Sequence, residues 1–328
     1  MKKKPPYIFV SVFTDEILAY LALRESQGYK VHKTRYSLRL LDSYLQTNRA
    51  TGKALTPAII DGLLQSLPEA MHTNTKNRHI TNFSQFARYL QSLGFEAFVP
   101  EQAQKDRLYA PYIFSEEEMD RIFAQVDQRM IQRYREKPAE LQYPLLLRLL
   151  YGCGLRLNEV LGLRAGDVDL DGGILLIRNA KGNKDRLIPM DPSLTEICRR
   201  YFAVTGKAEA PQDLLLPNDK GEQRSQVWAR KWFLWCLKQA GIAVPDLPRY
   251  QRNICLHCLR HTFAVNSLRQ QDLAGVDMYD AASLLATYLG HNKFQDTQRY
   301  LHMTAENSAD IINKTSAYTQ GLFPEVPQ

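Results

Sequence analysis

The sequence predicts a mainly α-helical protein with a small antiparallel β-sheet, arranged as two domains. Helical spacing of apolar residues recurs through residues 10–95 and again on both sides of one hairpin-like segment. In that segment the apolar run 174–177 and the returning strand 186–189 flank the turn-forming sequence Lys181-Gly182-Asn183-Lys184. A length of 328 residues is enough for about two domains.

Residues 10–95 predict an all-helical first domain. Four helical patterns begin near Thr14, His32, Pro57 and Thr75, and the last one ends at Gly94. Pro57 suits a first helical turn because its missing N–H is not needed there. The predicted apolar stripes are Ile17, Leu18, Leu21 and Leu23; Tyr36, Leu40, Leu41 and Tyr44; Ile59, Ile60, Leu63 and Leu64; and Ile80, Phe83, Phe86, Ala87 and Leu90.

A linker separates this domain from the second one. Residues 95–113 contain Pro100 and Pro111 and show little periodicity, so we set the domains at 1–105 and 106–328. Ser115 and Glu118 form a capping-box pattern that opens the second domain. Helical patterns follow at about 116–127 and 139–152, then the hairpin, and then mostly helical sequence from residue 225 onward.

The positive charge is concentrated in the first domain. The chain has 42 Lys and Arg against 35 Asp and Glu, a net charge of +7. Residues 1–105 hold 14 basic and 8 acidic side chains, which leaves 28 basic and 27 acidic ones for the remainder. A basic domain suits a polyanionic partner such as double-stranded DNA, although solubility alone is an equally good explanation.

The fourth predicted helix carries three of these basic side chains, Lys76, Arg78 and Arg88, and also His79. They could contact DNA, or they could form the solvated side of the helix, which is the commoner role of such charges. Lys76, Arg78 and Arg88, together with Lys184 in the hairpin turn, are the candidate DNA contacts.

Other features favour a reducing, non-membrane setting. No apolar run reaches the ~18 residues of a membrane span, and prolines interrupt the N-terminal MKKKPPYIFVSVF. Five cysteines are an odd number, which argues against a disulfide framework. We therefore expect a cytoplasmic, nucleoid-associated protein.

Cys255 and Cys258 raise the alternative of a metal or redox site, with His257 and His261 close by. Zinc sites normally show a second ligand pair at a readable distance, and none is visible here. No metal and no cofactor are therefore expected, and metal analysis of the protein would test this.

Four short segments hold the chemically informative residues. Arg156 and Glu159 lie three apart at a predicted helix start, where an arginine fork can bind two phosphate oxygens or simply form a surface ion pair. The lysines of the hairpin turn, Lys181 and Lys184, form the second segment.

The third segment, HCLRHTF, places His257, Arg260 and His261 on one helix face. Such groups are costly to bury without a partner, and an anionic ligand such as phosphate would supply one. The fourth segment has His291 followed by Tyr300. A helical tyrosine is far more often packing than nucleophile.

Taken in order, these segments resemble the tyrosine recombinase (phage integrase) family, which is marked by Arg, Lys, His-x-x-Arg, His and Tyr. The sequence segments that match the family pattern are GLRLNE, NAKGNKDRLIP, HCLRHTFA, YLGH and TQRYLHM. The likeness is strong over residues 113–315 and looser over the first domain. It implies a helical, SAM-like core-binding domain followed by an α+β catalytic domain, the pair closing around DNA as a clamp.

The resemblance also implies residue roles. Arg156, Arg260 and His257 would bind the phosphate, and His291 would hold it or help to deprotonate the tyrosine. Lys181 would protonate the departing 5′-oxygen, and Tyr300 would form a 3′-phosphotyrosine. Glu159 and His261 would support the site from behind. Neither ATP nor a metal ion would be needed, because the covalent bond conserves the phosphodiester energy and arginines neutralise charge.

Assembly is implied as well: a homotetramer acting on two DNA sites. The tail after Tyr300, with Ile311 and Ile312 on one side of a predicted helix, would dock on a neighbouring protomer or pack on its own domain. The stretch between Arg260 and His291 is longer than in compact chromosome-dimer resolvases and is similar to the transposon-associated branch. Integration, excision, transposition and dimer resolution therefore all stay open.

Two other functions remain possible from the sequence. Type IB topoisomerases and telomere resolvases use a similar residue set, and relaxation of plasmid without a specific site would favour them. A DNA-binding protein of the same fold without chemistry is the other, and trapping a covalent adduct would exclude it.

Overall fold

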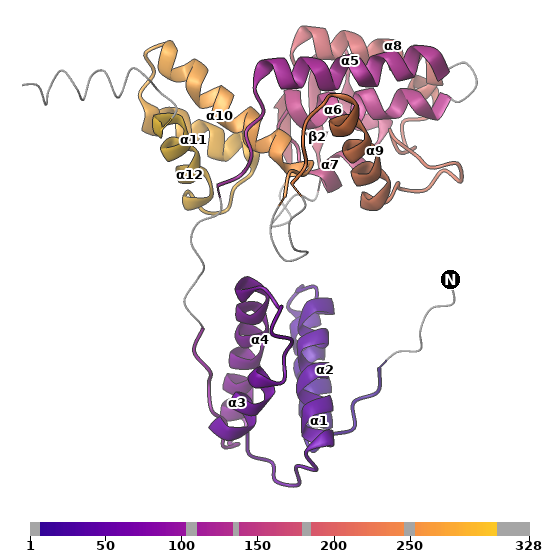
Figure 1. Ribbon diagram of the computed structural model, residues 1–328. Coiled ribbons are helices and arrows are strands. Elements are labelled where there is room, and N and C mark those ends of the chain that lie inside the picture. Colours follow the sequence, from indigo (N-terminus) through magenta and orange to yellow (C-terminus); the bar gives the residue numbers. More distant parts are fainter. Residues whose placement is uncertain (1–6, 103–109, 134–137, 179–184, 246–252, 307–328) are drawn as a thin grey trace, which may run out of the picture. The chain divides into compact units, whose positions relative to one another are not determined.

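The computed structural model describes residues 7–102, 110–133, 138–178, 185–245 and 253–306 (Figure 1). The chain folds into two compact units. Unit 1 takes in the described residues up to 102, and unit 2 those from 110 onward. The boundary predicted at 105/106 lies outside the described residues.

Unit 1 consists of the helices α1 (Thr14–Ser26), α2 (His32–Thr47), α3 (Pro57–Gln65) and α4 (Thr73–Ser92). The Thr56 side chain caps α3 by accepting from the backbone N–H of Ile59, and Pro57 occupies its first turn, as the sequence predicts. The stripe predicted on α4 is fully buried, and it packs with α1 and α2 around one core. The four predicted helices are thus present, and each begins within two residues of its expected start.

Some predicted faces of unit 1 are wrong. Leu18, Leu23 and Tyr36 are exposed, and α1 buries Tyr20 instead. His79, predicted to lie on a charged outer side of α4, is buried and hydrogen-bonds to the Ser37 hydroxyl at 2.9 Å. Burial lowers the pKa of His79, so this ring is a neutral core group and not a phosphate contact.

Unit 2 begins with α5 (Glu116–Arg133), whose capping box is confirmed. The Glu118 N–H donates to the Ser115 hydroxyl at 3.2 Å, and the Ser115 N–H donates to the Glu118 carboxylate at 3.0 Å. The 3₁₀ turn Pro138–Leu141 leads into α6 (Gln142–Gly152), and α7 (Leu157–Leu161) follows. Helices α8 (Pro192–Thr205) and α9 (Gln226–Gln239) complete the packing around the main core of this unit.

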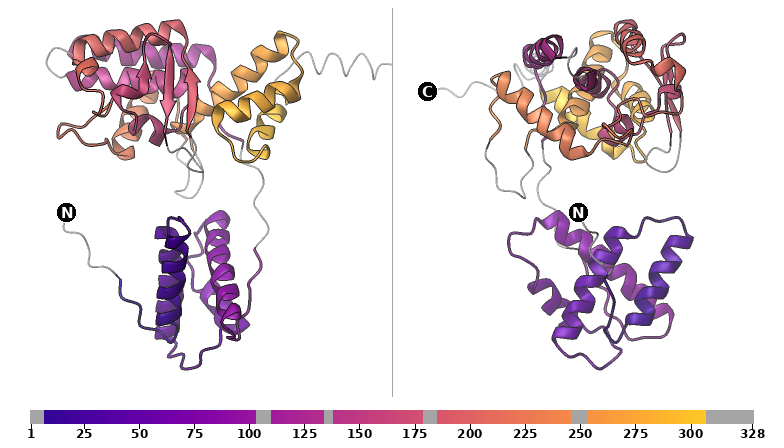
Figure 2. Two further views of the ribbon diagram at one scale, coloured as in Figure 1. Left: turned by 180° about the vertical axis from the view of Figure 1, so that it is seen from behind. Right: turned by 90° about the vertical axis from the view of Figure 1, so that its right-hand side faces the viewer.

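A three-stranded antiparallel sheet lies within unit 2, in the order β1-β2-β3. Strands β2 (Ile174–Ile177) and β3 (Arg186–Pro189) form the predicted hairpin, with Ile177 opposite Arg186. The short β1 (Val168–Asp169), which follows the 3₁₀ turn Ala165–Asp167, is an addition that the sequence did not predict. Leu175, Ile177 and Ile188 are buried, and helices lie against one face of the sheet (Figure 2).

Helices α10 (His257–Leu273), α11 (Met278–Leu289) and α12 (Gln295–Glu306) form a smaller helical group, drawn in orange and yellow in Figures 1 and 2. They enclose a second core, which contains Ala264, Leu268, Ala282, Leu285 and Tyr300. Helix α10 also packs against α6, which connects this group to the main core of unit 2.

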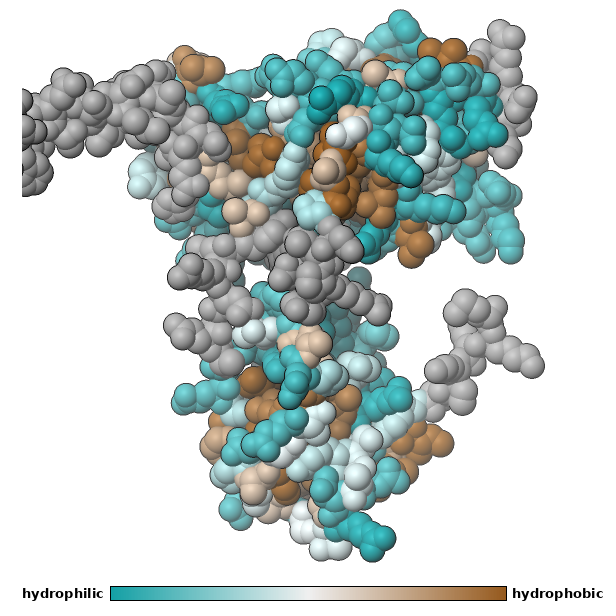
Figure 3. Space-filling view, in the orientation of Figure 1, coloured by the Kyte–Doolittle hydropathy of each residue, from teal (hydrophilic) through white to brown (hydrophobic). Residues whose placement is uncertain are grey.

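In Figure 3, hydrophilic residues cover most of the visible face of unit 2, with hydrophobic ones gathered near its middle. Among the described residues, every helix is too short or too polar to cross a lipid bilayer.

Candidate active site

Arg156 and Glu159 are positioned by the turn that precedes α7. Gly154 has φ +57°, and a Cβ atom there would lie 2.4 Å from the Phe263 ring, so only glycine suits this turn. Arg156 then caps α7, with its backbone N–H donating to Glu159 at 2.9 Å and its guanidinium donating to the same carboxylate at 2.8 Å. The pair predicted from the i, i+3 spacing is therefore formed.

Arg186, the first residue of β3, completes this ion-pair network. It donates to both oxygens of Glu159, at 3.0 and 2.9 Å. Burial on its own would raise the pKa of Glu159, but the hydrogen bonds from Arg186 and Arg156 outweigh it and hold that pKa at about 2. Glu159 is therefore ionised at neutral pH and fixes two guanidinium groups.

Three guanidinium groups donate hydrogen bonds to backbone carbonyls at the C-terminal end of α11. Arg186 donates to the carbonyl of Tyr288 at 3.0 Å, Arg260 to that of Leu289 at 2.7 Å, and Arg156 to that of Gly290 at 3.0 Å. Three consecutive carbonyls at a helix C-terminus form the negative end of its dipole. These carbonyls explain how three guanidinium groups can lie close together without a bound ligand. From the sequence, an anionic ligand was expected to stabilise the cluster of His257, Arg260 and His261.

Arg260 is the most buried of these cations, at 1% exposure. It also donates to the carbonyl of Gly154 at 2.7 Å. Burial, followed by repulsion from Arg156, lowers the pKa of Arg260 to about 10, so it is charged at neutral pH. In this hydrogen-bonded network three guanidinium groups face one carboxylate, which leaves an excess of two positive charges.

His291 sits between Arg260 and Thr297. Its Nε2 lies 3.0 Å from the Arg260 guanidinium, and its Nδ1 lies 2.7 Å from the Thr297 hydroxyl. Because a guanidinium can only donate, Nε2 accepts, and the proton of the neutral ring is on Nδ1. Burial and the neighbouring charges of Arg260 and Arg156 lower the pKa of His291 to about 4. This ring is therefore neutral at pH 7.

His257 and His261 begin α10. Their rings are in edge contact, with centroids 4.6 Å apart, and His257 is exposed whereas His261 is buried. The helix start adds the positive end of a dipole beside these rings.

Tyr300 lies on α12 with a side chain that is 2% exposed. Its hydroxyl is 2.8 Å from His261 Nδ1, and its ring stacks on His291 with centroids 6.3 Å apart. Burial raises the pKa of Tyr300, which favours the protonated phenol. The phenol thus faces the histidines of the cluster but is covered by its own helical group.

The structure brings together most of the predicted residues. Hydrogen bonds connect Arg156, Glu159, Arg260 and His291, and ring contacts and a hydrogen bond connect His257, His261 and Tyr300. Lys181 and Lys184 lie outside the described residues. Sequence reasoning assigned no role to Arg186 or Thr297. Their signals in the sequence are a charged residue at the start of a strand and a threonine three residues before the tyrosine.

The candidate DNA contacts on α4 do not share one face. Arg78 and Arg88 are exposed and Lys76 is half-buried. At about 100° per residue, Arg78 and Arg88 point about 80° apart, and Lys76 lies at least 120° from either. Their binding to DNA stays a prediction.

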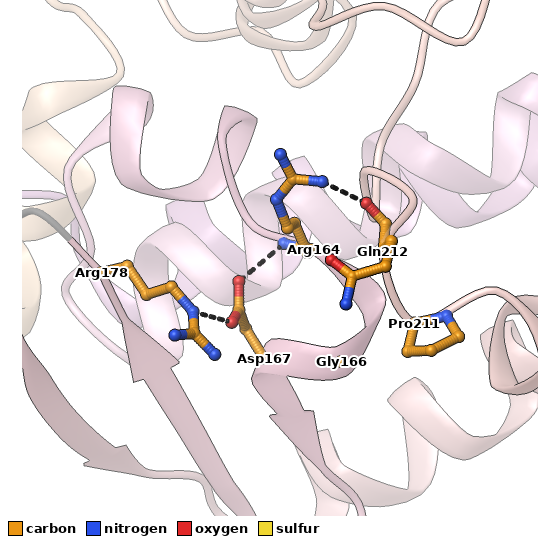
Figure 4. A pocket seen from close by; sticks show the side chains of 6 residues that line it. All are labelled: Arg164, Gly166, Asp167, Arg178, Pro211 and Gln212. Carbon is orange, nitrogen blue, oxygen red and sulfur yellow. Dashed lines mark hydrogen bonds and ion pairs between the residues drawn. The ribbon is translucent and has the colours of Figure 1, made fainter.

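A surface cavity of about 470 Å³ lies at Asp167, at the turn before β1 (Figure 4). Arg178 donates to the Asp167 carboxylate at 2.6 Å, the Arg164 backbone N–H donates to it at 3.0 Å, and the Arg164 guanidinium donates to the carbonyl of Gln212. These partners make the cavity a structural ion-pair site that holds the turn against β2.

Cys255 and Cys258 have sulfur atoms 3.9 Å apart, beside His257. Among the described residues, no group of three or more His, Cys, Asp or Glu side chains is arranged to hold a metal ion.

Comparisons with known proteins agree with this arrangement. The model of the phage integrase family matches residues 113–307. The tyrosine recombinase XerD of Rhizobium meliloti is 28% identical over 80% of this chain and 82% of its own. The tyrosine recombinase XerC of Oceanobacillus iheyensis is 25% identical over 95% of this chain and 98% of its own. The crystal structure of XerH site-specific recombinase, a post-cleavage complex with palindromic difH substrate, has a TM-score of 0.66 and 18% identity over 88% of this chain and 80% of its own. At that identity the structural likeness concerns the fold.

Proposed function

Since the chain belongs to the phage integrase family of tyrosine recombinases, we propose that it cleaves and rejoins DNA at specific sites through a 3′-phosphotyrosine at Tyr300. The observation that carries the proposal is the network of three guanidinium groups and one carboxylate, whose His291 stacks on the Tyr300 ring. Its excess of positive charge suits a phosphodiester, which bears one negative charge and gathers more in the transition state.

Arg156, Arg260 and His257 bind the non-bridging oxygens of the scissile phosphate. Glu159 and the carbonyls of α11 hold the arginines together before DNA arrives. Arg260 is 1% exposed, so its guanidinium has to be uncovered as DNA binds. His291 is the proposed acceptor of the phenol proton. In the neutral ring the lone pair is on Nε2, which accepts from Arg260 in the free protein, so Nε2 has to leave this hydrogen bond before it can take the proton.

The chemical step exchanges one phosphodiester for another. The Tyr300 oxygen forms a bond to phosphorus as the bond to the 5′-oxygen breaks, and Lys181 donates a proton to that oxygen. Attack by the 5′-hydroxyl of a partner strand reverses the step. Because phosphodiester bonds are conserved, the reaction needs no ATP, and the guanidinium groups take the charge-neutralising role that metal ions have elsewhere.

The proposed assembly has four protomers on two DNA sites, with the basic unit 1 adding phosphate contacts. The C-terminal tail would dock on a neighbouring protomer, although residues 307–328 lie outside the described ones. The biological task is integration, excision or transposition of a mobile element, or dimer resolution.

A trapping experiment tests the chemistry. We would incubate the full chain with nicked duplexes of random sequence, from which the released strand diffuses away, isolate covalent adducts under denaturing conditions, and sequence them to define a selected site. The wild type should form adducts. Tyr300→Phe should form none while keeping its DNA affinity. Tyr279→Phe, at an exposed tyrosine of α11, is the matched control and should react normally. Adducts with Tyr300→Phe would refute the assignment.

A further inference from the structure

His261 is in contact with the reacting atom of the proposed nucleophile, in a conformation where attack is blocked. The Tyr300 side chain is 2% exposed and packs with Ala264, Leu268 and Leu285. Attack on phosphorus needs the oxygen within about 3.5 Å of it. A phosphate flanked by two deoxyriboses cannot approach a covered phenol, so the side chain has to move before cleavage.

In this covered position the Tyr300 hydroxyl is hydrogen-bonded to His261. Its Nδ1 lies 2.8 Å from the Tyr300 hydroxyl, and the histidine itself is 6% exposed. With the ring proton on Nε2, the phenol donates to Nδ1. His261 is on α10 next to Arg260, so the contact ties α12 to the helix that carries a phosphate-binding arginine.

We infer that His261 is a positioning residue that holds the Tyr300 hydroxyl in a withdrawn place in the free protein, so that cleavage requires this hydrogen bond to break. This inference rests on the proposed function. The alternative, in which His261 removes the phenol proton, needs the contact in the attacking conformation, whereas the contact occurs with the phenol covered.

The two roles predict opposite effects of removing Nδ1. A neutral hydrogen bond that must break favours the withdrawn state by about 3- to 10-fold, which converts to ~0.6–1.4 kcal/mol. A lost proton acceptor would instead slow the reaction by roughly 100-fold or more.

The experiment compares His261→Phe, which keeps a ring but removes the acceptor, with His261→Asn, whose amide oxygen can replace Nδ1. The single-turnover rate of adduct formation at saturating nicked duplex of the selected site is measured, with DNA affinity and melting temperature. We expect His261→Phe to react about 3- to 10-fold faster at unchanged affinity, and His261→Asn to match the wild type. A slower His261→Phe with a near-normal melting temperature, or equal changes in both variants, would overturn the inference.

A second measurement needs no variant. N-acetylimidazole acetylates accessible phenols, and peptide mass spectrometry reports the extent at each tyrosine. In the free wild type, Tyr300 should be strongly protected relative to Tyr279, which is 69% exposed. Rapid modification of Tyr300 in the free protein would contradict a withdrawn phenol. A wild type that forms no adduct but protects Tyr300 would refute the proposed function and support only the covered position of the phenol.

Discussion

Glu159 organises the site because one carboxylate receives hydrogen bonds from two guanidinium groups and a backbone N–H. Its side chain is only 8% exposed, so solvent screens these interactions weakly. Loss of its charge would leave Arg156 and Arg186 close together in a half-buried space.

The pKa of Glu159 predicts an acid-dependent part of stability. Because the folded pKa of about 2 is below the ordinary 4.5, the contribution is fully present above pH 4.5 and is lost as the pH falls toward 2. The difference corresponds to ~3 kcal/mol. Chemical unfolding between pH 6 and 2.5 should show a steeper loss for the wild type than for Glu159→Gln. Parallel curves would show that this carboxylate does not carry the effect.

A substitution of Arg156 tests whether the planar shape of its guanidinium is needed or whether a positive charge is enough. Its fork reaches Glu159 and the Gly290 carbonyl at the same time, and a lysine ammonium cannot reproduce that planar arrangement. Arg156→Lys should lower the single-turnover cleavage rate by roughly 100-fold or more, with DNA affinity nearly unchanged. Arg200→Lys, at an exposed position of α8, is the control. A variant within a few-fold of the wild type would exclude a bidentate role for Arg156.

At the residue scale, the order of the candidate residues along the chain identified the site, whereas the spacing within each short segment did not. His257, Arg260, His291 and Tyr300 were found through the family pattern, whereas Arg186 was overlooked because its partner Glu159 is 27 residues away. The burial of Tyr300 could not be read from the chain either. It depends on how α12 packs on α10 and α11, which is a tertiary property.

At the element scale, the C-terminus of α11 and the turn before α7 meet at the arginines. Gly290 ends α11 in a left-handed conformation, with φ +65°, which exposes its carbonyls to the guanidinium groups. Helix positions and the β2–β3 hairpin were predictable because their patterns are local. The role of the α11 carbonyls was not, because it depends on contacts between segments more than 100 residues apart.

Gly154 provides a prediction about the turn. Gly154→Ala adds a Cβ atom 2.4 Å from Phe263 at φ +57°, whereas Gly275→Ala, at φ +75°, meets no atom within 4 Å. Gly275→Ala should cost about 1–2 kcal/mol of unfolding free energy for the backbone alone. Gly154→Ala should cost about 1–3 kcal/mol more, because the core must shift. Urea unfolding measures both, and equal losses would show that the close packing at Phe263 is not needed.

At the scale of the whole molecule, the proposed function has both units binding one polyanionic partner. The composition is compatible with this for the first unit, since the first 105 residues hold most of the excess positive charge. The residues that contact DNA could not be predicted as well. A basic helix has a solvated side in any case, and His79, which lies among the basic residues of α4, is in the core.

Salt dependence tests the contacts of unit 1. Each phosphate contact contributes a slope of about −0.9 to log K against log salt. Arg78→Ala should therefore lower the magnitude of the slope by about 1, and Arg200→Ala should leave it unchanged. Fluorescence anisotropy with a labelled duplex of the selected site gives both slopes. Identical slopes for the wild type and Arg78→Ala would remove Arg78 from the interface.

In the proposed reaction one phenol, that of Tyr300, forms the covalent bond to DNA. Nuclease and trypsin digestion of the trapped adduct, followed by tandem mass spectrometry, locates the nucleotide on the protein. In the wild-type chain we expect a nucleotide attached through a 3′-phosphate to the oxygen of Tyr300. A nucleotide on any other residue would contradict it.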